Sequence, residues 1–220
     1  MVKRVEIRQS VMAADERHAR AIRKEMGRRS IVMLNLIGSP GAGKTTLLEA
    51  TLRKASFRCA VIEGDVATSR DAERIAAAGA PVVQINTKGG CHLEAHLVAK
   101  ALESLPLDEI DVLFVENVGN LVCPAEFDLG EDGKIAVSSV PEGADKPLKY
   151  PHLFHQALAV ILTKADLKPH VAFDDALFWN DVTGLNPKAP RLEVASTRGE
   201  GIGDWISLVE MWLRSKGEGR

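Results

Sequence analysis

A glycine-rich segment restricts the possible folds of this chain more than anything else in it. The segment reads Gly38-Ser39-Pro40-Gly41-Ala42-Gly43-Lys44-Thr45 and fits the pattern G-x-x-x-x-G-K-S/T. An apolar run of strand length, residues 31–37, precedes it, and residues 46–52 follow with apolar side chains at helical spacing. A buried strand, a glycine loop and a helix are the context in which this pattern forms a phosphate-binding loop, or P-loop. The sequence therefore predicts a site for a nucleoside triphosphate.

The residue types of the loop suit a phosphate cradle. Its glycines let the backbone adopt left-handed conformations and turn N–H groups toward an anion, and the following helix directs its positive end at the same point. Lys44 can reach the β- and γ-phosphates, and the hydroxyl of Thr45 can ligate Mg²⁺. We expect the loop and its flank to contact the nucleotide through Gly38, Ser39, Gly41, Ala42, Gly43, Lys44, Thr45 and Thr46.

The rest of the chain alternates apolar strands with helices. Strands are expected at 59–63, 81–85, 112–115, 135–140, 158–162 and 192–195, and helices at 71–78, 93–103 and 204–214. This alternation predicts an α/β fold: a P-loop NTPase of the SIMIBI type, with a mostly parallel sheet of about seven strands and helices on both faces. We expect an N-terminal amphipathic helix within residues 1–28, ending near Gly27, and a P-loop domain over residues 29–220.

Composition and charge argue against several classes of protein. The formal net charge of −2 predicts no nucleic-acid partner. The apolar runs have strand length and no signal peptide opens the chain, so we expect a cytoplasmic location and no membrane partner. Three cysteines, an odd number, argue against a disulfide framework and leave metal ligands or inert core residues as the alternatives.

Acidic residues follow two of the predicted strands. Asp65 and Glu116 should therefore approach the phosphates, where a carboxylate can hold Mg²⁺ directly or through water and can orient an attacking water. Asp71 is a further candidate for the Mg²⁺ shell, and helix capping is the alternative for Asp65. Gly119 occupies the place of a switch glycine that senses the γ-phosphate, although a plain turn would use a glycine too. We predict that Lys44, Asp65, Glu116 and Gly119 form the catalytic group.

The base of the nucleotide is predicted by the segment Thr163-Lys164-Ala165-Asp166. It resembles the Asn-Lys-x-Asp motif of GTPases, in which the aspartate accepts hydrogen bonds from guanine N1 and N2 and the lysine lies over the base. Adenine lacks that donor pair and would leave Asp166 unpaired. Thr163 stands where Asn is usual, and its hydroxyl can replace part of the amide's hydrogen bonding. The loop from Ser196 resembles the one that places an N–H on guanine O6, so GTP is expected rather than ATP.

Cysteine and histidine gather in two further segments. Cys91, His92 and His96 lie close together in the chain, and Cys123 follows the switch glycine by four residues. Thiolates and imidazoles are ligands for Zn²⁺ or Ni²⁺. On a helix start, Cys91 or His92 can share one side with His96. One chain supplies too few ligands for a closed tetrahedral site, which suggests an open site or one shared across a two-fold axis. Buried cysteines with satisfied histidines are the alternative.

Four segments together resemble the HypB family of hydrogenase nickel-incorporation GTPases: residues 38–46, 64–66, 86–96 and Glu116-Asn117-Val118-Gly119-Asn120-Leu121-Val122-Cys123-Pro124. The resemblance extends from about Ile31 to Leu213. It implies a GTP-hydrolysing metallochaperone that helps to load nickel into [NiFe]-hydrogenase. It also implies a site for Ni²⁺ or Zn²⁺ made by Cys91, His92 and Cys123, with His96 as an auxiliary ligand, beside a GTP-dependent homodimer interface.

The same resemblance implies two partners, a HypA-type nickel chaperone and the [NiFe]-hydrogenase large-subunit precursor. Because Cys123 lies so close to Gly119, movement of the switch would disturb the metal site. We therefore expect GTP and Mg²⁺ to order the loop, bring two subunits together and define the metal site, which hydrolysis would loosen. The chain has no histidine-rich N-terminal tract and no cysteine motif near Met1, and Cys59 is expected to be an inert core residue.

Three other functions are weighed against this interpretation. A urease-type nickel chaperone would carry Cys-Pro-His at its metal motif, whereas this chain has Cys91-His92 and a separate Cys123-Pro124. An ATP-dependent small-molecule kinase would need an adenine site, which Asp166 disfavours. A purely structural G-domain scaffold would have only vestigial GTP hydrolysis, which a measurement of GTP turnover would distinguish from an active GTPase.

Overall fold

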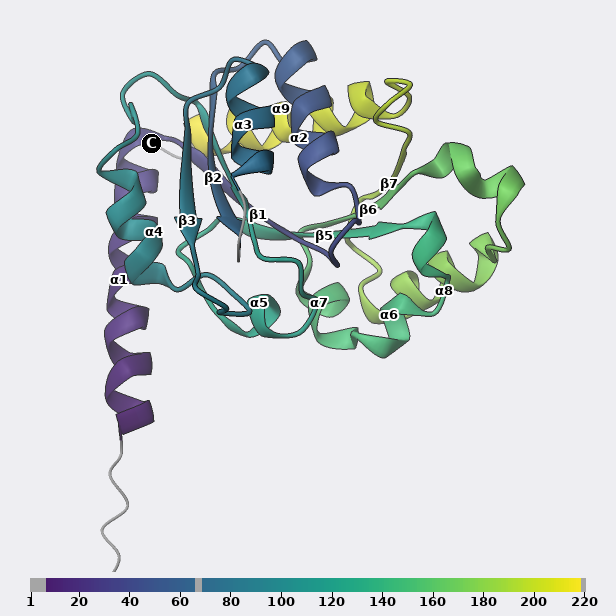
Figure 1. The fold of residues 1–220 in the computed structure, drawn as a ribbon, viewed down its shortest axis with the longest axis horizontal. Helices are drawn as coiled ribbons and strands as arrows, with labels where there is room; N and C mark the ends of the chain where they lie inside the picture. The colour runs from purple at the N-terminus through teal and green to yellow at the C-terminus, as the bar shows by residue number, and fades with distance from the viewer. Residues whose placement is uncertain (1–6, 66–68, 219–220) are drawn as a thin grey trace, which may run out of the picture.

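The computed structural model describes residues 7–65 and 69–218, with side chains from residue 13 onward, and places helices on both faces of one sheet (Figure 1). The strands are β1 (Val32–Ile37), β2 (Cys59–Asp65), β3 (Val82–Asn86), β4 (Val112–Glu116), β5 (Gly133–Ser139), β6 (Ala159–Thr163) and β7 (Arg191–Val194). Their order is β3-β2-β4-β1-β5-β6-β7, and every pairing between these strands is parallel. The predicted α/β fold is confirmed.

The longer helices are α1 (Ile7–Arg29), α2 (Lys44–Lys54), α3 (Arg70–Ala77), α4 (Ala95–Leu102), α8 (Asp175–Leu185) and α9 (Ile202–Glu218). Helices α2, α3, α4 and α8 each connect two consecutive strands, as parallel pairing requires, whereas α1 precedes β1 and α9 follows β7. Short helical turns are α5 (Cys123–Glu126), η1 (Val140–Glu142), α6 (Lys146–Lys149), α7 (Pro151–Gln156) and η2 (Ala165–His170). No helix within the described residues is both long enough and apolar enough to cross a membrane.

Alternation along β1 shows how the two faces are covered. Leu34 and Leu36 pack under α2 and α9, where Trp205 is fully buried. Met33 packs with α1 and α4 on the other face, and Ile37 packs there with the residues of α7 and α8. β1 is therefore buried on both sides, which explains its nearly continuous apolar sequence.

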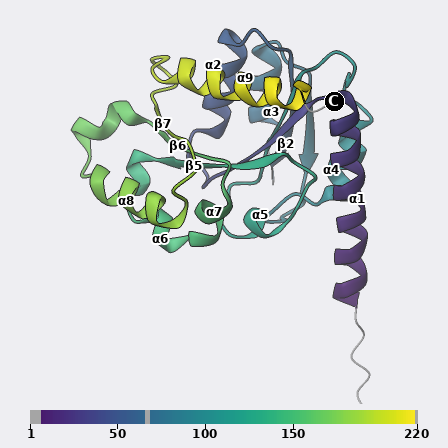
Figure 2. The same cartoon turned by 180° about the vertical axis from the view of Figure 1, so that it is seen from behind.

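The N-terminal helix α1 lies beside α4 in both views (Figures 1 and 2). It ends at Arg29, two residues after Gly27, near which its end was expected. Ser30 ends it with a left-handed φ of 58°, and the N–H of Ile31 bonds to the carbonyl of Met26 at 3.0 Å. Residues 1–6 of the predicted N-terminal segment lie outside the described residues.

Candidate functional site

The P-loop forms one side of a pocket at the carboxyl ends of β1, β2 and β4. The pocket has a volume of about 420 Å³. Gly41 and Gly43 adopt left-handed φ angles of 76° and 88°, as the phosphate cradle requires. The buried Lys44 begins α2, and its Nζ donates to the carbonyls of Gly38 (3.2 Å) and Ser39 (3.4 Å). The ammonium group therefore lies directly under the loop.

Thr45 and Glu116 meet at the bottom of this pocket. The Thr45 hydroxyl donates to Glu116 Oε1 at 2.8 Å, and Glu116 is only 5% exposed. Burial raises the pKa of Glu116 to about 7, against the opposing effects of Lys44 and the Thr45 hydrogen bond. Its second oxygen, Oε2, has no hydrogen-bond partner within the described residues. Such an oxygen is a ready ligand for a cation or an acceptor for water.

A second buried glutamate, Glu63, lies beside Glu116 and was missed by the sequence analysis. The two residues are register partners on β2 and β4, and Glu63 is 2% exposed. Its Oε2 also has no partner among the described residues. Burial, with the neighbouring charge of Glu116, raises the pKa of Glu63 to about 8. The available signal was a glutamate inside a strand that is otherwise apolar and buried on both faces.

These carboxylates fit Mg²⁺. Two buried, unpaired carboxylate oxygens beside a threonine hydroxyl form the hard oxygen donor set that Mg²⁺ prefers. Asp65 and Asp71 line the same pocket, and Asp71 pairs with Arg74 at 3.0 Å. The N-cap position of α3 belongs to Ser69, so Asp65 is not the cap of that helix.

The segment after β4 connects the P-loop to the cysteine segment. A Cβ on Gly119 would lie 2.7 Å from Pro40 Cγ and 2.9 Å from Pro40 N, so this close contact requires glycine. Asn117 Oδ1 accepts the N–H of Leu93 at 3.1 Å, and Asn120 Nδ2 donates to the carbonyl of Cys91 at 3.3 Å. A displacement of residues 117–120 would therefore move both neighbours.

Cys91, His92 and Cys123 form a cluster in which one donor atom from each lies within 4.8 Å of the others. Cys91 Sγ is 3.5 Å from His92 Nδ1, and the hydrogen bond with Cys123 raises the pKa of the Cys91 thiol. His92 stacks on Phe127 with ring centroids 3.8 Å apart, and its buried Nε2 has no partner in the described part of the chain. Burial lowers the pKa of His92 and favours the neutral, metal-binding imidazole.

His96 lies in a different group from the one that the resemblance implied. Because α4 begins only at Ala95, Cys91 and His92 lie in the loop before the helix rather than on its first turn. His96 Nδ1 is 3.1 Å from Glu94 Oε2 and 3.6 Å from Asp15 Oδ1. Cys59 is buried at the start of β2, and burial raises the pKa of its thiol to about 12, as suits a core cysteine.

Of the two predicted base-recognition loops, the one at residues 163–166 forms hydrogen bonds with the P-loop. The Thr163 hydroxyl donates to the carbonyl of Ala42 at 2.5 Å, and Lys164 Nζ donates to the carbonyl of Gly41 at 2.7 Å. Asp166 forms an ion pair with Arg198 Nε at 3.4 Å, which brings the two loops together. The Ser196 hydroxyl is buried without a partner among the described residues.

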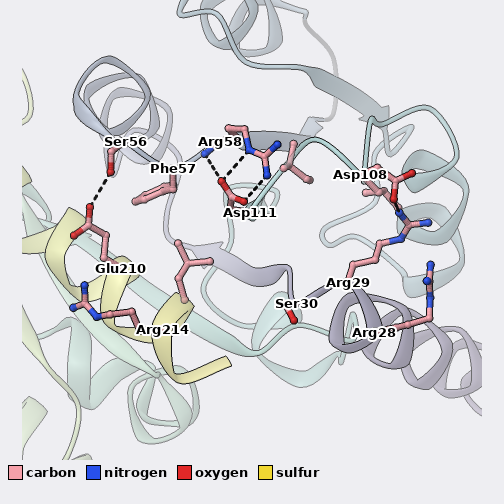
Figure 3. A pocket seen from close by; sticks show the side chains of 13 residues that line it. Arg28, Arg29, Ser30, Ser56, Phe57, Arg58, Asp108, Asp111, Glu210 and Arg214 are labelled. Carbon is pink, nitrogen blue, oxygen red and sulfur yellow. Dashed lines mark hydrogen bonds and ion pairs between the residues drawn. The ribbon is translucent and has the colours of Figure 1, made fainter. Parts of the chain in front are cut away.

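A larger pocket of about 840 Å³ lies at the opposite ends of the same strands (Figure 3). Its charged residues largely pair with one another, as Arg58 does with Asp111 at 2.7 Å and Arg29 does with Asp108. None of the unpaired buried polar atoms found in the described residues belongs to its lining. The chemistry of this chain is concentrated at the carboxyl ends of the strands.

Comparison with known proteins agrees with this geometry. The family described as "CobW/HypB/UreG, nucleotide-binding domain" matches residues 32–193. The hydrogenase maturation factor HypB of Escherichia coli K12 is 48% identical over 208 residues, covering 94% of this chain and 72% of its own length. The chain belongs to the HypB family. HypB of Helicobacter pylori, whose structure is a complex with nickel, superposes with a TM-score of 0.89 at 37% identity, covering 92% of this chain and 96% of that one.

Membership of the HypB family makes this chain a P-loop GTPase among hydrogenase maturation factors. The fold is of the SIMIBI type. The signal recognition particle 54 kDa protein of Aeropyrum pernix shares it at a TM-score of 0.53 and 15% identity, covering 83% of this chain and 49% of that one. That likeness shows the fold alone.

Proposed function

We propose that this chain is a nickel metallochaperone that assists nickel insertion into [NiFe]-hydrogenase, and that its GTP state controls dimerisation and metal binding. One observation carries the proposal: residues 116–123 run without interruption from the P-loop hydroxyl of Thr45 to the thiol of Cys123. Within this segment Gly119 touches Pro40 of the P-loop and Asn120 bonds to the cysteine segment. A movement of the segment at the P-loop would therefore also displace Cys123, and a movement of Cys123 would displace the segment at the P-loop.

GTP is the proposed nucleotide. The P-loop from Gly38 to Thr46 would hold the phosphates, with Lys44 opposite the β- and γ-phosphates. Asp166 and Lys164 would bind guanine, and the loop at Ser196 would contact its O6. The unpaired Ser196 hydroxyl supports a ligand at that loop. This part of the proposal excludes an ATP-dependent kinase, and competition of GDP and ADP for the site tests it.

Hydrolysis would use the carboxylates of the same pocket. Thr45, Asp65 and Glu116 are proposed to hold Mg²⁺, with Asp71 and Glu63 in its outer shell. The ion, when bound, would neutralise charge that develops on the phosphates. Lys44 would act on the same charge from the P-loop side. Gly119 would present its N–H to the γ-phosphate, because its closeness to Pro40 places the backbone at the loop.

Ni²⁺ is the proposed cargo of the Cys91–His92–Cys123 cluster, and Zn²⁺ can occupy the same site. The two thiolates and one imidazole of a single chain leave the coordination incomplete. A second copy of the chain would complete it, which makes the homodimer part of the site. This explains why a GTP-dependent dimer would bind the metal differently from a monomer.

The partners are proposed on the same basis. A HypA-type chaperone would exchange nickel with this chain, and the large-subunit precursor of [NiFe]-hydrogenase would be the acceptor. Residues 1–28, most of which form α1, are proposed as a docking element attached to the GTPase domain at 29–220. A cytoplasmic location would suit these partners.

A single-turnover release assay tests the proposal. Nickel-loaded chain is mixed with excess chelator and either GTP or a non-hydrolysable analogue in the presence of Mg²⁺. We expect nickel to leave at the rate of GTP hydrolysis and to be retained with the analogue. Equal release in both samples would refute the coupling, and no hydrolysis at all would indicate a scaffold.

A further inference from the structure

A second group of metal-binding side chains lies where α1 meets the start of α4. α1 contributes Asp15, the N-cap position of α4 contributes Glu94, and the first turn of α4 contributes His96. One donor atom from each lies within 4.8 Å of the other two. None of the three belongs to the thiolate cluster of Cys91, His92 and Cys123, although Glu94 follows His92 by only two residues.

The three donors converge closely. His96 Nδ1 lies 3.1 Å from Glu94 Oε2 and 3.6 Å from Asp15 Oδ1. The Asp15 side chain is 12% exposed, and its Oδ1 accepts the backbone N–H of His96 at 3.0 Å. This hydrogen bond holds the Asp15 carboxylate at the N-terminal end of α4. The contact also joins residues 81 positions apart, so the packing of α1 on α4 builds the group.

The charge of the group favours a cation. Within the described residues, the only ion-pair partner of Asp15 and of Glu94 is the imidazole of His96. Two carboxylates thus face a single imidazole, and no lysine or arginine in that part of the chain pairs with them. One imidazole and two carboxylates are a common ligand set for divalent transition ions, whose remaining positions are taken by water.

His18 adds a second histidine at the edge of this group. It lies one turn after Asp15 on the same side of α1, and its ring centroid is 6.3 Å from that of His96. His18 Nδ1 is 2.9 Å from the carbonyl of Ala14. When the Nδ1–H of a histidine donates to a carbonyl, the lone pair of Nε2 is available to bind a metal ion. This arrangement is typical of metal-ligating histidines.

We propose that Asp15, Glu94 and His96, with His18 beside them, bind a second divalent transition ion such as Ni²⁺ or Zn²⁺. The site uses only nitrogen and oxygen donors, so its ion is held by harder ligands than an ion at the thiolates. It does not depend on the proposed function of the thiolate cluster. Because Glu94 follows His92 by only two residues, the site would give a metal ion a second binding position close to that cluster.

Nickel titration of a chain without the thiolate cluster tests the site. The variant Cys91→Ala/His92→Ala/Cys123→Ala removes the first site, and Ni²⁺ alone is titrated by calorimetry without nucleotide. We expect one equivalent of Ni²⁺ to bind. When His96→Ala or Asp15→Asn is introduced into this triple variant, its affinity for Ni²⁺ should fall by at least about 10-fold. His152→Ala, which removes an exposed histidine on α7, is the matched control and should leave it unchanged.

Cobalt spectra of the otherwise unaltered chain supply a second readout that does not need the triple variant. Thiolate ligands give Co²⁺ intense charge-transfer absorption, and nitrogen and oxygen ligands do not. His96→Ala should remove one bound Co²⁺ per chain and leave the thiolate absorption intact. Circular dichroism checks that the variants fold. The proposal is overturned if the triple variant binds no Ni²⁺, or if His96→Ala changes neither the nickel affinity nor the cobalt stoichiometry. Failure of the thiolate site alone would appear as missing charge-transfer absorption.

Discussion

The side-chain amide of Asn120 donates a hydrogen bond to the main-chain carbonyl of Cys91 over 3.3 Å. Asn120 follows Gly119, the residue in contact with Pro40 of the P-loop, and Cys91 belongs to the thiolate cluster. This bond directly joins the segment after β4 to a residue of the Cys91–His92–Cys123 cluster. It allows a direct test of the proposed coupling between the nucleotide site and the metal site.

Asn120 variants should weaken that coupling without removing a metal ligand. Asn120→Asp keeps the acceptor that binds the N–H of Val122 at 2.8 Å but loses the donor to Cys91. We expect nickel still to bind, while the ratio of affinities in the GTP-analogue and GDP states moves toward one. Asn120→Ala should behave alike, because it also lacks the donor. An unchanged ratio in both variants would assign the coupling to another contact.

Asp166 should decide the choice of base. Removal of two hydrogen bonds to a charged carboxylate costs about 1.5–3 kcal/mol each. Asp166→Ala should therefore weaken GDP binding by at least about 100-fold and leave the weak binding of ADP unchanged. Arg198→Ala is the control, because it removes only the ion-pair partner of Asp166. Equal losses for GDP and ADP would show that Asp166 does not read guanine.

The three cysteines should differ in their effect on nickel. Cys91→Ala and Cys123→Ala each remove a thiolate from the cluster and should lower nickel affinity by at least about 10-fold. Cys59→Ala removes a thiol of the same size from the buried start of β2 and should not change nickel binding. Thiol labelling of the native chain should also spare Cys59. A nickel site that tolerates both Cys91→Ala and Cys123→Ala would contradict the assignment.

The paired glutamates predict how stability depends on pH without nucleotide or Mg²⁺. Burial raises the pKa of Glu63 to about 8 and that of Glu116 to about 7, from an ordinary 4.5. Between about pH 5 and pH 8 the folded chain therefore binds more protons than the unfolded chain, so its free energy of unfolding falls as pH rises. We expect urea unfolding to show this fall, at up to about 1.4 kcal/mol per pH unit for each of the two carboxyls.

Glu63→Gln isolates this effect, because it keeps the size of the side chain and removes its charge. The fall between pH 5 and pH 8 should be smaller in this variant than in the unaltered chain. Glu210→Gln, at the other end of the strands, serves as the control and should reproduce the original slope. An identical slope in the Glu63→Gln variant would mean that this carboxyl does not titrate in the window.

Local sequence predicted much of the fold, and the reasons are physical. β1 and β4 are apolar runs buried on both faces, and the P-loop glycines satisfy a backbone requirement that few other residues meet. Helix α8 was not predicted, because its sequence mixes Thr183 and Gly184 with aromatic residues and has little helical preference. Helix α1 ends two residues beyond Gly27, because Ser30 and not a glycine takes the left-handed conformation.

The site could be predicted only where its residues are close in the chain or follow a strand end. The Cys91–His92 pair and the segment from Glu116 to Cys123 meet that condition. The approach of Glu63 to Glu116 depends on strand order, which places β2 beside β4. The approach of Asp15 to His96 depends on helix packing. Neither of these two approaches can be predicted from local sequence, although a glutamate in the otherwise apolar β2 marks Glu63 itself.

Nickel binding measured together with molecular mass tests the central claim most directly. The chain is titrated with Ni²⁺ at equilibrium in the presence of Mg²⁺ with GDP, and again with a non-hydrolysable GTP analogue, and the mass in solution is measured in the same samples. We predict that nickel affinity and dimer fraction change together with the nucleotide and that Cys91→Ala abolishes the change. Equal affinity and equal mass in the two nucleotide states would contradict a GTP-controlled metal site.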